Sequence, residues 1–135
     1  MGRTVAGLAC GLVAWFVVAT VGGLVLRMVW PDYADVEKAM AFTPGMMIAR
    51  LLVGAVSSAV AGGIVAWITR RNQRAVVAVA VLLVALFIPV HYALWERFPP
   101  WYHLVFFVSL LLITMLGAPA YPRENVRVHA PGSGE

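Results

Sequence analysis

Charged residues are scarce in this chain, and four long stretches contain none at all. Only 12% of the 135 residues are Asp, Glu, Lys or Arg, whereas 62% are hydrophobic. Soluble domains are about 45–50% apolar and about 25% charged. A soluble domain of this length has too small a core to hide so much apolar surface, so the composition excludes an ordinary soluble fold.

Cysteine is nearly absent as well, and so are charges at membrane depth. Cys10 is the single cysteine, which excludes a disulfide within the chain and a metal site built from several thiolates. No Asp, Glu or Lys lies in the middle of an uncharged stretch, although ion-coupled transporters need such a group near the midplane. Phosphate-binding and dinucleotide-binding motifs are absent too. We therefore expect a non-enzymatic protein without a cofactor.

Each uncharged stretch is long enough to cross a membrane. A helix rises about 1.5 Å per residue and the hydrocarbon layer is about 30 Å thick, so one span needs roughly 20 residues. The sequence thus predicts an all-α, polytopic membrane protein with four transmembrane helices in an antiparallel bundle of two hairpins. We expect spans at about 4–30, 44–69, 75–96 and 100–118 in a transmembrane domain of residues 1–118, followed by a flexible tail at 119–135.

Basic residues predict the orientation of these spans. Lys and Arg concentrate in the cytoplasmic loops of membrane proteins, and the turn at 70–74 carries three arginines. With four spans, the side of this turn holds Arg3, Arg70, Arg71, Arg74, Arg123 and Arg127, and the other side holds Arg27, Lys38, Arg50 and Arg97. We expect a multi-pass protein of the cell membrane, such as a bacterial inner membrane, with both termini cytoplasmic. Because the basic residues flank spans, nucleic acid is not an expected partner.

Local signals mark the ends of the helices. The segment at about 32–42 has one apolar and one polar side, which favours a short interfacial helix capped by Asp32, although a solvated loop fits equally well. Thr43 and Pro44 indicate the start of the second long helix. Pro89 predicts a bend in the third helix, and Gly117 indicates the end of the fourth.

Small residues recur about every four positions on the first two long helices, so they share one face of each. Such faces let helix backbones approach closely, which drives helix packing in lipid. The expected helix-packing residues are Gly7, Gly11, Gly23, Gly54, Ser58, Gly62 and Gly63. These faces can pack within the chain, against a second copy or against another membrane protein.

Aromatic and polar side chains gather near the opposite rim. We expect Trp95, Trp101 and Tyr102 to anchor the protein at the membrane surface. A rim polar cluster is expected from Arg50, His91, Glu96 and His103. Imidazoles from two helices can hold haem or a metal, but histidines that only hydrogen-bond are commoner and no ligand motif is present, so no metal site is expected.

Arg50 has its own pair of interpretations. It lies inside the second helix, where a charge is costly, so it either extends to the rim or pairs with an acid. The acids on its side of the membrane are Asp32, Asp35, Glu37 and Glu96.

Three functions remain open from the sequence. The favoured one is an accessory or assembly subunit that contacts the lipid bilayer and binds itself or another membrane protein through Gly54, Ser58 and Gly62. The second is a small oligomeric channel or transporter. The third is a metal or haem binder at the extracytoplasmic rim.

Overall fold

The computed structural model describes residues 1–118, which form five helices and no strand. The helices are α1 (Gly2–Val29), α2 (Tyr33–Ala39), α3 (Pro44–Ile68), α4 (Gln73–Ala93) and α5 (Pro100–Leu116). The expected all-α class is confirmed. The expected flexible tail at 119–135 lies outside the described residues.

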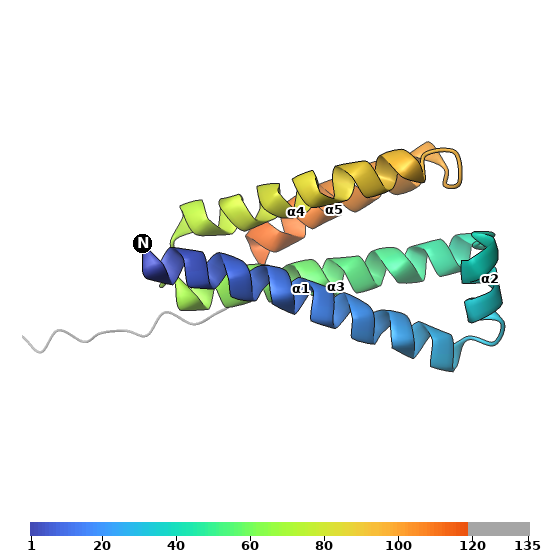
Figure 1. Ribbon diagram of the computed structural model, residues 1–135, viewed down its shortest axis with the longest axis horizontal. Helices are drawn as coiled ribbons and strands as arrows, with labels where there is room; N and C mark the ends of the chain where they lie inside the picture. Colours follow the sequence, from blue (N-terminus) through green and yellow to red (C-terminus); the bar gives the residue numbers. More distant parts are fainter. Residues whose placement is uncertain (119–135) are drawn as a thin grey trace, which may run out of the picture.

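The four longer helices form two antiparallel hairpins (Figure 1). The first hairpin consists of α1 and α3, with α2 inside its connection, and the second consists of α4 and α5. The N-terminus and the α3–α4 turn lie at one end of the molecule, whereas α2 lies at the other end. Within the described part, the helices follow one another in the order that the uncharged stretches predict.

The lengths and surfaces of the helices indicate a multi-pass membrane protein. Three of them, α1, α3 and α4, are long and apolar enough to cross a membrane, and α5 is apolar but shorter, at 17 residues. Their outer sides expose many large aliphatic side chains, among them Val13, Val17, Leu52, Leu82 and Leu112. Exposure of so many large apolar side chains is unfavourable in water and typical of contact with lipid.

Helix α3 packs on each of the other long helices, because its small residues allow close approach on several sides. A Cβ atom on Gly62 would meet the main-chain carbonyl of Thr114 in α5. Reciprocally, a Cβ atom on Gly117 would meet the carbonyl of Ala59 in α3. The backbones of α3 and α5 therefore touch at two glycines, whereas on the α1 side Gly11 faces the side chain of Val65.

The helix ends agree with the local signals in part. Thr43 caps α3 by accepting a hydrogen bond from the amide of Met46 at 3.4 Å, as expected. Asp32 precedes α2 but makes no side-chain capping bond, since its own backbone is left-handed with φ 64°. Gly117 follows α5 with right-handed φ −62°. Its small size serves the contact with Ala59 and not a left-handed turn.

The arginine-rich turn is tight and lies beside the N-terminus. Arg70 and Arg71 both have positive φ, 53° and 64°, and the amide of Arg71 donates to the carbonyl of Ala66 at 2.7 Å. Arg3 donates from Nε to the carbonyl of Ile68 at 3.2 Å. Four arginines, Arg3, Arg70, Arg71 and Arg74, thus gather at this end of the molecule.

Candidate functional site

A cavity of about 360 Å³ lies between the two hairpins, near the end that carries α2. All five helices contribute side chains to it, and it is not fully enclosed. Its volume falls within the roughly 300–1,000 Å³ of small-molecule sites, which combine mostly apolar walls with a few polar groups. The polar side chains around it are Thr20, Arg27, Tyr33, Glu37, Arg50, His91, Tyr102 and His103.

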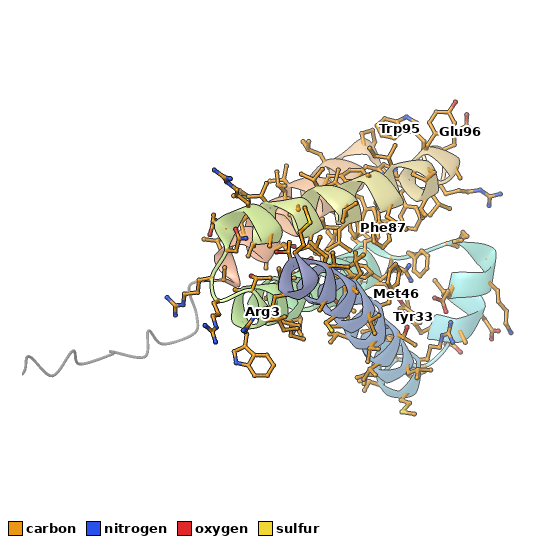
Figure 2. All side chains as sticks on the ribbon, turned by 60° about the vertical axis from the view of Figure 1, so that its left-hand side comes forward. Arg3, Tyr33, Met46, Phe87, Trp95 and Glu96 are labelled. Atoms are coloured by element: carbon orange, nitrogen blue, oxygen red, sulfur yellow. The ribbon has the colours of Figure 1, made fainter. Side chains whose placement is uncertain are left out.

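The side chains between the helices are small at the end with the arginine-rich turn and larger toward α2, and this difference leaves room for the cavity. Near the arginine-rich turn, Gly62 brings α3 of the first hairpin against α5 of the second, and Gly7 and Gly11 pack α1 on α3 within the first hairpin. Toward α2, large rings take their place, and Phe87 of α4 packs against Trp15 of α1 with ring centroids 4.7 Å apart. Figure 2 shows Phe87 pointing from α4 toward the first hairpin. The hairpins are therefore tightly packed at one end and held apart by rings at the other.

Arg50 connects α3 to the short helix α2 at the edge of the cavity. Its Nη1 atom donates to the hydroxyl of Tyr33 at 3.2 Å and to Oε1 of Glu37 at 3.3 Å. The guanidinium also lies over the ring of Phe42, 4.7 Å from its centroid. Of the two interpretations of Arg50, the structure shows pairing with an acid, and the acid is Glu37.

Glu37 is shared by two arginines. Its Oε2 atom accepts a hydrogen bond from Nε of Arg27 at 2.8 Å and lies 2.7 Å from Nη2 of the same residue. Glu37 therefore links α1, α2 and α3 at one point. Two guanidinium groups face one carboxylate here, so the charged lining of the cavity has a net charge of +1 when the histidines are neutral.

The two histidines of the expected rim cluster touch each other. The Nδ1 atoms of His91 in α4 and His103 in α5 are 2.7 Å apart, so one ring donates its Nδ1–H to the other. Both rings are buried, His103 to 2% exposure. Among residues 1–118, neither Nε2 of His103 nor Nε of Arg50 has a hydrogen-bond partner.

The histidine pair does not fit a metal ion held between the two Nδ1 atoms. Two nitrogens that bind one tetrahedral zinc at 2.0–2.1 Å are about 3.3 Å apart, which exceeds the observed 2.7 Å. Across the described residues, no group of three His, Cys, Asp or Glu side chains gathers that could hold a metal. The same short contact leaves no room for a haem iron between these atoms.

The structure unites part of the expected rim cluster. Arg50, His91 and His103 line one cavity, whereas Glu96 is exposed outside it. Figure 2 shows Trp95 and Glu96 at the outer end of the second hairpin, beyond Phe87.

The three expected anchors occupy different environments. Trp95 and Trp101 are 55% and 44% exposed, as an anchor at the membrane surface requires. Tyr102 is only 6% exposed and lines the cavity, where its ring stacks on Phe98 with centroids 4.7 Å apart. Neighbours in sequence point about 100° apart around a helix, so Tyr102 faces inward while Trp101 faces outward.

The expected helix-packing residues also divide into groups. Gly7 and Gly11 contact α3 or its end, and Gly62 contacts α5. Ser58 and Gly63 are buried inside the bundle, and Ser58 accepts a hydrogen bond from Nε1 of Trp15 at 3.1 Å. The remaining two, Gly23 and Gly54, line the cavity.

Sequence reasoning missed several lining residues. Glu37 was expected only as one of four acids open to Arg50, and Tyr33 only as part of an interfacial segment. The two lie four positions apart on α2 and so share the face that meets Arg50. That spacing was a usable signal. The rings of Trp15, Phe87 and Phe106 could not be assigned to the cavity from the sequence, because an aromatic ring inside a span can face either lipid or the interior of the bundle.

Comparison with known protein families, with curated proteins and with solved structures finds no match to this chain.

Proposed function

We propose that this chain is a non-enzymatic membrane protein that binds a small molecule in the cavity between its hairpins. The proposal rests on one observation: polar side chains that include Arg50, His91, His103 and Tyr102 meet in a single cavity whose remaining lining is apolar. Converging polar groups on an apolar wall are typical of ligand sites. A buried donor or acceptor without a partner costs about 1–3 kcal/mol, so a ligand that satisfies Arg50 and His103 gains affinity.

The proposed protein crosses the membrane four times, with both termini in the cytoplasm. Helix α5, at 17 residues, reaches the lower limit of about 17–25 residues for a span. The clustering of Arg3 with the arginine-rich turn supports a cytoplasmic location for that end. The cavity then lies near the extracytoplasmic rim.

This topology predicts which tags can be reached from outside. A peptide tag at either terminus should be accessible to antibody only after cells are permeabilised, whereas a tag inserted after Glu96 should be accessible in intact cells. The matched pair of tags controls for expression and for leakage. A terminal tag that is labelled in intact cells contradicts the proposed orientation.

A subunit role through small-residue faces receives less support from the geometry. Gly11 and Gly62 already contact helices of the same chain, and Ser58 is buried. A partner on these faces would have to displace α1 or α5. The lipid-facing sides of the helices, which carry mainly large aliphatic residues, remain for association with another membrane protein or with a second copy.

Filling the cavity should remove the ligand while the fold is kept. Gly23 lines the cavity, and a Cβ atom at this position meets nothing within 4 Å. We expect the wild-type protein, purified in a mild detergent, to carry about one bound small molecule per chain. The Gly23→Phe variant should carry less than about a tenth of that amount, since the ring occupies the same space. Native mass spectrometry and extraction with chromatography measure both.

The matched control is Gly2→Phe. Gly2 also has no atom within 4 Å of an added Cβ, and it lies at the opposite end of α1, outside the cavity. Both variants should unfold at the temperature of the delipidated wild type, since a bound ligand itself stabilises the folded state. Equal ligand content in Gly23→Phe, Gly2→Phe and the wild type would refute the cavity as the binding site.

A further inference from the structure

We infer that the ligand of this cavity is an amphiphile with an anionic headgroup, a carboxylate or a phosphate, on a hydrocarbon chain. The inference rests on the proposed ligand-binding function and adds the chemical class of the ligand. Charge, free hydrogen-bonding atoms and apolar walls each contribute a separate argument.

The charge of the lining favours an anion. Arg27 and Arg50 share the single carboxylate of Glu37, which leaves one positive charge uncompensated among the lining residues. Arg50 sits within an apolar helix of a proposed span, where an uncompensated charge is costly. A headgroup with one negative charge neutralises the site, whereas a neutral headgroup leaves the cost in place.

The arrangement of Arg50 leaves donors for such a headgroup. Its known hydrogen bonds to side chains both come from Nη1, and its Nε is buried without a partner among residues 1–118. A guanidinium presents its N–H groups as a planar fork that matches two oxygens of a carboxylate or phosphate. Arg50 is therefore the residue we assign to the headgroup.

The histidine pair adds a further polar contact. When both rings are neutral, the ring that accepts at Nδ1 carries its proton on Nε2, so the pair offers one Nε2–H donor and one Nε2 acceptor. Nε2 of His103 has no partner in the described part of the chain. If Nε2 of His103 carries a proton, it donates to a headgroup oxygen. If it does not, it accepts from a protonated phosphate or carboxyl group.

The apolar walls of the cavity favour a ligand with a hydrocarbon chain over a free inorganic anion. Leu24, Val53, Phe87, Val90 and Phe106 line the cavity from three of the long helices and from α5. A small ion leaves these side chains without a partner, whereas a hydrocarbon chain gains about 0.8 kcal/mol per buried CH₂ group. The cavity is not fully enclosed, so a ligand larger than its volume can extend beyond it.

The test compares headgroups on a constant chain. Delipidated protein in dodecyl maltoside is titrated with oleic acid, oleoyl lysophosphatidic acid, mono-oleoylglycerol and inorganic phosphate, and Kd is measured by native mass spectrometry. We expect both anionic lipids to bind at least about tenfold more tightly than mono-oleoylglycerol, equivalent to about 1.4 kcal/mol. Inorganic phosphate should bind at least about tenfold more weakly than oleoyl lysophosphatidic acid.

Variants assign the preference to one residue. Arg50→Gln should weaken binding of the anionic lipids about tenfold and leave mono-oleoylglycerol unchanged, whereas Arg50→Lys, which keeps the charge, should keep the preference. Arg97→Gln is the matched control, because Arg97 is exposed on the same side of the proposed membrane and lies outside the cavity. If Arg50→Gln does not fold, the comparison of Kd values among the four probes on the wild-type protein decides whether the site prefers an anionic headgroup.

Three results overturn the inference in distinguishable ways. Equal Kd values for the anionic and neutral lipids refute the headgroup charge but leave the ligand-binding function intact. Equal Kd values for phosphate and oleoyl lysophosphatidic acid show that the ligand is a soluble anion and refute the amphiphile. Failure of all four probes to bind refutes the inferred ligand class, whereas the ligand content of Gly23→Phe decides the proposed function separately.

Discussion

Replacing Gly62 with leucine is expected to destabilise the protein by about 3 kcal/mol or more, since the new side chain collides with the main chain of α5. A Cβ atom at this position meets the carbonyl oxygen of Thr114 and lies 2.9 Å from its carbonyl carbon and 3.2 Å from its Cα. A flexible side chain could rotate away, but a helix backbone cannot. The unfolding temperature in dodecyl maltoside should fall by about 10 °C.

Gly23→Leu provides the comparison for this variant. It makes the same substitution in another long helix, at a glycine that has no atom within 4 Å of an added Cβ. It should unfold within about 2 °C of the wild type. Similar losses in both variants would show that leucine in place of a helical glycine is harmful in itself, and the close α3–α5 contact would lose its explanation.

Removing the Glu37 carboxylate is expected to have the second largest effect. Glu37→Ala leaves Arg27 and Arg50 without their common acceptor, so the bond from Arg50 to Tyr33 is the remaining side-chain link between α2 and α3 at this point. Breaking a fully buried ion pair costs about 3–5 kcal/mol. Since Arg50 and Glu37 are 34% and 28% exposed, we expect about 1–2 kcal/mol after solvent screening. Limited proteolysis should also cut the α1–α3 connection faster.

Asp35→Ala is the matched control on the same short helix. Asp35 pairs with Lys38 at 3.5 Å, but both side chains are 80% exposed, and such pairs contribute little to stability. This variant should keep the unfolding temperature and the proteolysis rate of the wild type. If Asp35→Ala and Glu37→Ala behave alike, the bridge between the two arginines does not hold α2 in place.

The helices could be predicted from the sequence because each uncharged stretch is a long and local signal. The expected starts and ends differ from those of α1, α3, α4 and α5 by a few residues at most. The sharpest local signal was Thr43 followed by Pro44, because capping depends on neighbouring residues alone.

The cavity could not be predicted to the same degree, since it depends on how two hairpins dock. Four acids were available to Arg50, and only the docking of α2 selects Glu37. The contact of His91 with His103 joins two helices across their shared turn. Glu96 is close to both histidines in sequence yet lies outside the cavity, because the chain turns outward after α4.

The two glycines at the α3–α5 contact also restrict how this sequence can vary over time. At most buried positions a larger side chain can be accommodated by trimming its neighbour, so paired substitutions keep the volume constant. Gly62 and Gly117 each contact a main-chain carbonyl, and no substitution of the residue that carries it makes that carbonyl smaller. Neither position has a compensating partner, so both must stay glycine for as long as this helix pair is retained.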